Sequence, residues 1–130
     1  MDQEVVMNSN YILMVIHKIK ETYDDIDFLS DFDCVNKMVD GSTAVDIKRL
    51  DIIADKYEDE FNFIFGMERQ TNLNTNFYHI YNPNLEYAFR LRNGMIKIYV
   101  IRKYKANLTD EIKNILINGT DFEFYNLIVS

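Results

Sequence analysis

The spacing of apolar residues along this chain changes near residue 61. Before that point apolar side chains recur every three or four positions, which is the period of a helix with one buried face. From there on, short runs place apolar residues at every second position, as Phe61, Phe63 and Phe65 do, and this period is typical of a strand. The change predicts a helical part over about residues 8–58 and a sheet-rich part over about residues 61–130.

Three helices are expected in the helical part, over residues 11–23, 32–39 and 44–58. Asp40-Gly41 is a natural stop for the second helix, because glycine tolerates the left-handed backbone that ends many helices. Thr43 with Asp46 resembles a capping box at the start of the third. Residues 24–33, between the first and second helices, are expected to form an acidic linker.

The strongest strand signal is Asn93-Gly94, a dipeptide typical of two-residue hairpin turns. It separates residues 85–92 from residues 95–104, and both segments are rich in apolar side chains. A two-residue turn fixes the register of the two strands. We therefore expect Arg90 to face Lys97 across the hairpin, on the same face as Tyr99.

Further strands are expected over residues 61–65, 77–81 and 122–129, with one helix between Thr109 and Gly119 before the last strand. Helices thus come first, and the strands that follow are mostly neighbours in sequence. This order predicts a single α+β domain over residues 1–130, with N-terminal helices packed on an antiparallel sheet of about four to five strands.

Charge is divided unevenly between the two parts. Up to Glu68 the chain has sixteen acids and six bases, whereas between Glu68 and Asp110 it has seven bases and one acid. The net charge of −7 conceals this division. Because summed charge decides what a surface attracts at range, each part is a candidate binding surface.

The acidic candidate lies on the third expected helix. Asp51, Asp55 and Asp59 are spaced four residues apart, so they form one stripe on a helix, with Glu58 beside it. The acids of the expected linker extend this surface: Asp24, Asp25 and Asp27. A solvated helix face, a surface for a basic partner and a metal site all fit such a stripe. No metal is expected, because no histidine or further ligand accompanies the carboxylates.

The basic candidate is the expected hairpin. Single-stranded nucleic acid is bound by cations beside an aromatic platform, and Tyr99 lies among several. These residues are the alternative nucleic-acid site: Arg90, Arg92, Lys97, Tyr99, Arg102 and Lys103. A solvated or internally paired sheet face is the competing interpretation, and the signature of the RNA-recognition motif is absent.

Catalysis finds little support in the sequence. A nucleophile needs a positioned base, and no such spacing is present. His17 precedes Glu21 by one helical turn and is expected to form a surface pair. His79 and Cys34 are expected to be structural. We therefore expect no enzyme, no cofactor and no catalytic residue.

Composition indicates the class of protein and the compartment in which we expect it. The chain is 48% apolar and has one cysteine, which excludes disorder and fits a reducing compartment. No run approaches the roughly 18 apolar residues of a membrane span, and the acidic N-terminus does not resemble a signal peptide. We expect a cytoplasmic protein without membrane contact. Residues with AT-rich codons number 63 against 14 with GC-rich codons, which indicates an AT-rich genome.

Together these patterns predict a small acidic binding protein without catalysis. We expect a phage, virus or mobile element to encode it, and the protein to inhibit a host macromolecule as anti-defence and immunity proteins do. The partner is expected to be a host protein with a basic site, for example one that binds nucleic acid. Two alternatives stay open: nucleic-acid binding by the hairpin, and an oligomeric structural protein, such as a homodimer, whose acidic and basic halves pair between subunits.

Overall fold

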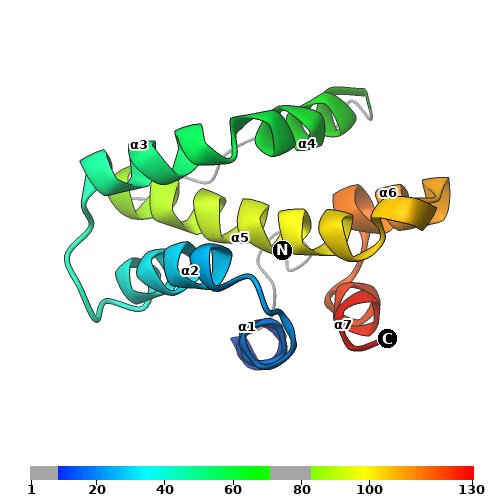
Figure 1. Cartoon of the computed structure of the whole chain (residues 1–130), viewed down its shortest axis with the longest axis horizontal. Coiled ribbons are helices and arrows are strands. Elements are labelled where there is room, and N and C mark those ends of the chain that lie inside the picture. Colours follow the sequence, from blue (N-terminus) through cyan, green and yellow to red (C-terminus); the bar gives the residue numbers. More distant parts are fainter. Residues whose placement is uncertain (1–8, 71–82) are drawn as a thin grey trace. The chain divides into compact units, whose positions relative to one another are not determined.

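The computed structural model of the chain describes residues 9–70 and 83–130, and this part contains helices and no strand. The expected α+β fold is therefore wrong, and no antiparallel sheet is present in the described residues. The chain forms these helices in order: α1 (Ser9–Thr22), α2 (Ile26–Val39), α3 (Ile47–Lys56), α4 (Glu58–Gln70), α5 (Pro83–Lys103), the 3₁₀ helix η1 (Lys105–Asn107), α6 (Asp110–Asn118) and α7 (Asp121–Val129) (Figure 1).

The chain divides into two compact units. The central unit comprises Asp25–Ile98, and the terminal unit comprises Met1–Asp24 with Tyr99–Ser130. Helix α5 supplies its residues up to Ile98 to the central unit and its last turn to the terminal unit. Both binding surfaces predicted from the sequence are consequently divided between the two units.

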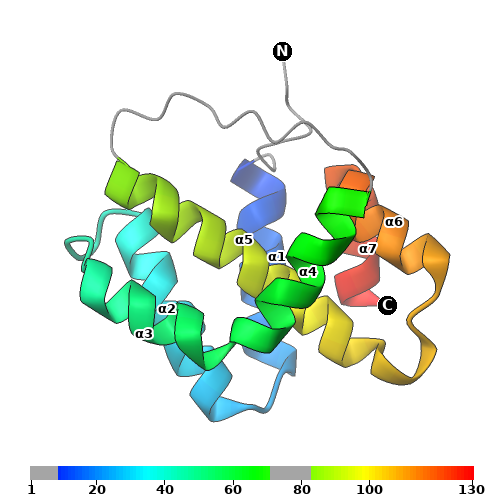
Figure 2. The same ribbon diagram turned by 90° about the horizontal axis from the view of Figure 1, so that it is seen from above.

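In the central unit, α3 runs beside α5, and α4 continues from α3 and crosses α5 (Figures 1 and 2). The core consists of large apolar side chains that are fully or almost fully buried: Phe28, Phe32, Val35, Leu50, Ile53, Ile64, Met95 and Ile98. Burying one such side chain is worth about 1.5–3 kcal/mol, so these positions determine how the helices pack.

The second helix begins earlier than expected. Helix α2 starts at Ile26, because Asp25 caps it by accepting a hydrogen bond from the Phe28 amide at 3.1 Å. Asp27 lies in its first turn, where the helix dipole favours negative charge. The acids of the expected linker are thus helix-start signals. The helix ends as predicted, at Asp40, and Gly41 takes a positive φ of 84°.

The third expected helix is two helices. Asp46 is the N-cap of α3 and accepts from the Arg49 amide at 3.2 Å, so it does not complete a capping box with Thr43. The helix ends at Tyr57, and α4 starts at once with three acids in its first turn. The expected strand over residues 61–65 lies in α4. Phe61 is buried and Phe63 is 44% exposed, which the strand period does not allow.

The expected hairpin is the long helix α5. Pro83 occupies its first position, where the missing N–H costs nothing. Most of its buried residues recur at helical spacing, namely Ala88, Leu91, Arg92, Met95, Ile96, Tyr99 and Val100, and Ile98 is buried on a further side. Apolar residues lie on several sides of this helix, and such a sequence resembles a buried strand as much as a buried helix. Asn93-Gly94 therefore lies inside a helix and makes no turn.

In the terminal unit, α1 lies beside α7, and α6 contacts α7. The first helix was predicted within two residues at its start and one at its end. Helix α6 was also predicted correctly: Thr109 caps it and Gly119 follows it. The last expected strand is wrong, because Thr120 and Glu123 form a capping box that starts α7.

The expected strand over residues 77–81, with His79, lies outside the described residues and cannot be compared with the structure. Within residues 9–70 and 83–130, no helix is both long and apolar enough to cross a membrane.

Candidate functional site

The exposed acids of the central unit concentrate where α3 meets α4. Asp55, Glu58 and Asp59, which we call the acidic corner, are all exposed and border a hollow of about 210 Å³. No basic side chain in the described part of the chain forms an ion pair with any of the three. The negative charge of the acidic corner is therefore available to a partner.

Exposed apolar side chains flank the acidic corner. Ile52 precedes Asp55 by three residues on α3 and is 57% exposed. Phe63 follows Asp59 by four residues on α4 and is 44% exposed. Residues at these spacings share a helix face. Each apolar side chain is thus adjacent to one of the acids.

The other predicted acids have different roles. Asp51 accepts a hydrogen bond from the Tyr87 hydroxyl at 2.7 Å, and burial together with this bond raises the pKa of Tyr87 to about 12. Asp25 caps α2, and Asp27 pairs with Lys56 at 2.5 Å. Asp24 is exposed but belongs to the terminal unit. The predicted acidic surface is therefore reduced to the acidic corner.

A buried carboxylate was missed in the sequence. Asp31 is 4% exposed, accepts from the Tyr57 hydroxyl at 2.8 Å and pairs with Lys56 at 2.9 Å. These bonds hold Tyr57 at the break between α3 and α4. The hydrogen bonds to Asp27 and then to Asp31 raise the pKa of Lys56. Asp31 thus positions the acidic corner, which begins two residues before Tyr57.

The basic residues of the central unit do not form one exposed face. Arg90 pairs with Glu86 at 3.0 Å, one turn earlier on α5. Lys97 is half-buried and Arg92 is buried. The hairpin register that placed Arg90 opposite Lys97 does not exist; on a helix, residues seven apart share one side.

Arg92 is a buried cation with neutral partners. Its guanidinium donates to the Asn93 side chain at 3.2 Å and lies 4.9 Å from the centre of the Phe89 ring. Burial lowers the pKa of Arg92 to about 10, because the charged form loses its hydration. The charge is therefore unfavourable to folding at neutral pH.

We predict that Arg92→Met raises the free energy of unfolding by about 1 kcal/mol, because methionine fills similar space without a buried charge. Urea denaturation followed by circular dichroism measures the change. Arg90→Met is the control, since Arg90 is exposed and ion-paired; it should give no gain. If Arg92→Met unfolds at a lower urea concentration than the wild type, this account of Arg92 is wrong.

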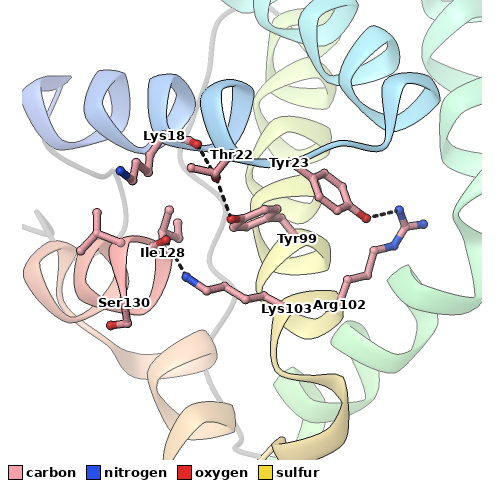
Figure 3. Close-up of a pocket in the computed structure, with 9 residues that line it drawn as sticks. Lys18, Thr22, Tyr23, Tyr99, Arg102, Lys103, Ile128 and Ser130 are labelled. Carbon is pink, nitrogen blue, oxygen red and sulfur yellow. Dashed lines mark hydrogen bonds between the residues drawn. The ribbon is translucent and has the colours of Figure 1, made fainter.

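The terminal unit contains a pocket of about 540 Å³. We call it the basic pocket. Three residues of the predicted nucleic-acid site line it, namely Tyr99, Arg102 and Lys103, together with six that the sequence did not indicate: Lys18, Thr22, Tyr23, Ile128, Val129 and Ser130 (Figure 3). No acidic side chain is among these nine residues. The pocket combines three cations with several hydroxyl groups.

His17 and Cys34 were expected to have no catalytic role. His17 is on the surface of α1 and pairs with Glu21 at 3.2 Å, as expected. Cys34 is half-buried in α2. Within residues 9–70 and 83–130, no cluster of three His, Cys, Asp or Glu side chains is arranged to hold a metal ion.

Comparison of the chain with known protein families, with curated proteins and with solved structures gave no match. Function must therefore be argued from the acidic corner and the basic pocket themselves.

Proposed function

We propose that this chain is a binding protein without catalysis, and that its acidic corner meets a basic site on a host protein. The observation that carries the proposal is the group of three exposed acids, Asp55, Glu58 and Asp59, without an ion-pair partner among the described residues. The dipole of α4 favours Glu58 and Asp59 in its first turn, but like charges this close repel one another. Asp55 lies in the last turn of α3, where the dipole of that helix disfavours negative charge. A cationic partner relieves that repulsion.

The chemistry of the flanking residues supports a protein partner. Complementary charge speeds association and fixes orientation more than it adds affinity. Affinity comes mainly from apolar and aromatic anchors that become buried. Ile52 and Phe63 supply such anchors beside the acids. The acidic corner thus combines steering by charge with exposed apolar area on adjacent helix faces.

The class of partner follows from this combination. Surfaces that bind nucleic acid are basic because they contact its phosphates, so an acidic protein can compete with nucleic acid for them. With the AT-rich coding of the chain, this supports an inhibitor encoded by a phage, virus or mobile element. Nucleic-acid binding by α5 is the weaker proposal, because Arg90 is ion-paired and Arg92 is buried.

The test uses paired charge reversals. Wild-type chain and the Asp55→Lys/Asp59→Lys variant are immobilised, and host proteins that bind the wild type are identified and purified. We expect the reversal to slow association with such a partner at least tenfold, and the wild-type rate to fall steeply with salt. Phe63→Ala should mainly speed dissociation. Nucleic acid should compete with the chain for the partner.

The matched control is Asp110→Lys/Glu111→Lys on α6, which changes the net charge equally at exposed acids outside the acidic corner. This variant should bind as the wild type does, apart from a small general charge effect. If both reversals weaken binding equally, the acidic corner has no specific role. If neither does, the partner binds elsewhere and the proposal fails.

A further inference from the structure

Two cations of the basic pocket, Lys103 and Arg102, donate hydrogen bonds to neutral groups. Lys103 donates to the main-chain oxygens of Leu127 and Ile128, at 3.0 and 2.7 Å, near the end of α7. Arg102 donates to the Tyr23 hydroxyl at 3.1 Å. No carboxylate pairs with Lys103 in the described part of the chain. Its positive charge is thus compensated by carbonyl dipoles and by the ring of Tyr104, whose centre lies 5.5 Å from the ammonium nitrogen.

Lys18 brings a second ammonium group to the same pocket. Among the described residues it pairs with Glu21 alone, at 3.7 Å, which is longer than a hydrogen bond. Partial burial, and then the charge of Lys18, lower the pKa of Lys103. Figure 3 shows Lys103 reaching Ile128, and the side chain of Lys18 leaving α1 on the side of α7. An ammonium carries three N–H donors, so both lysines retain donors for a ligand.

The hydroxyl groups of the pocket are ordered. Thr22 donates to the main-chain oxygen of Lys18 at 2.7 Å, which uses its single hydrogen. The Tyr99 hydroxyl, 3.3 Å from Thr22, is then the donor in that pair. Tyr99 is buried, and its ring meets the Tyr23 ring edge to face at 5.2 Å. The floor of the pocket is therefore rigid and aromatic beside the cations.

We infer that the basic pocket of the terminal unit binds a small phosphomonoester of about the size of a mononucleotide. A dianionic phosphate matches the local positive charge, relieves the repulsion between Lys18 and Lys103, and accepts their remaining hydrogen bonds. The cavity of 540 Å³ lies within the range of small-ligand sites, roughly 300–1,000 Å³. The aromatic floor suits an apolar or aromatic remainder of the ligand.

The test is a titration of the ¹⁵N-labelled full chain with AMP at low salt, followed by amide chemical shifts. We expect saturable shifts around Thr22, Tyr99 and Ile128, weaker binding of inorganic phosphate, and no saturation by adenosine. Binding should weaken as salt rises. Adenosine binding as tightly as AMP, or no shifts with AMP or phosphate at millimolar concentration, would overturn the inference.

Variants locate the site. Lys18→Gln removes a side chain that holds no hydrogen bond, so the fold is kept; we expect the Kd for AMP to rise roughly tenfold or more. Lys20→Gln is the matched control on the same helix, and it does not line the pocket. It should leave the Kd unchanged. An equal rise of the Kd in both variants would show that AMP is attracted by the general positive charge of the helix, and it would contradict a specific site.

Two further measurements distinguish this inference from the proposal for the acidic corner and from nucleic-acid binding. Asp55→Lys/Asp59→Lys should leave the Kd for AMP unchanged. The proposal for the acidic corner and the inference for the basic pocket can therefore fail independently of one another. A ten-nucleotide single strand should bind no more tightly than AMP. If the strand binds much more tightly, and Lys105→Gln in the terminal unit weakens its binding as much as Lys18→Gln does, the terminal unit is a nucleic-acid site and the small-ligand inference is wrong.

Discussion

Replacing Asp31 by alanine is expected to lower the free energy of unfolding by about 3 kcal/mol. The Tyr57 hydroxyl, on a side chain that is only 5% exposed, loses its acceptor. Lys56 loses one of its two carboxylate partners and keeps the other. An unsatisfied buried hydroxyl and a lost charged contact both add to the cost. Urea denaturation of the variant and wild type measures it.

Asp27→Ala is the matched control for Asp31→Ala. Both carboxylates lie on α2 and contact the same ammonium group of Lys56, but the Asp27 side chain is 69% exposed. Exposed ion pairs contribute little, so Asp27→Ala should cost no more than about 1 kcal/mol, including its effect on the helix dipole. Equal losses in the two variants would contradict the role given to the buried carboxylate.

Replacing Gly94 by alanine is expected to destabilise the chain by about 2 kcal/mol, although alanine favours a helix. A Cβ atom at Gly94 would overlap the ring of Phe61, which packs from α4 against this point of α5. The gain in helix propensity is only about 1 kcal/mol, and overpacking outweighs it. Thermal and urea unfolding measure the change.

Gly66→Ala separates packing from propensity. Gly66 lies in α4 with open space around its Cα, so alanine there should stabilise by about 0.5–1 kcal/mol. Phe61→Leu in the Gly94→Ala background should recover part of the loss, because leucine lacks the ring edge that overlaps. Stabilisation by Gly94→Ala would show that Phe61 does not pack on α5.

The sequence predicted those helices whose signals are local. Helix α6 has a threonine cap, acids in its first turn and a glycine after its end, and all of these act within a few residues. Helix α1 has an apolar stripe at helical spacing, although Leu13 and Met14 make it apolar on other sides too. The strands were wrong for a tertiary reason: α5 is apolar on several sides because helices pack around it, and no local pattern distinguishes that from a strand.

The alternation in α4 was misleading in another way. Phe61, Phe63 and Phe65 appear at every second position, but only Phe61 is buried. Phe63 and Phe65 are exposed. The prediction of a strand assumed that all three rings are buried on one face, so it could not be correct here. Acids in the first turn of α4 were the overlooked signal, since negative charge is favoured at a helix start.

The environments of the candidate site residues could be predicted from the sequence only where they depend on local signals. Asp55, Glu58 and Asp59 were expected on the surface and are exposed there, because charged side chains are visible in a sequence. Their role in binding stays a prediction. Asp31 was overlooked because residues 24–33 were taken as a linker; on a helix, Asp31 falls on the buried face with Phe28 and Phe32. Lys18 and Thr22 lie one turn apart on α1, but their meeting with Lys103 depends on tertiary packing.

All of these placements depend on one claim, that residues 83–103 form a helix through Asn93-Gly94. Backbone chemical shifts of the ¹³C,¹⁵N-labelled chain test it most directly. We expect helical ¹³Cα shifts without interruption from Asn84 to Arg102, including Gly94. Extended shifts on both sides of Asn93-Gly94, with cross-strand contacts between Arg90 and Lys97, would restore the hairpin and contradict this account.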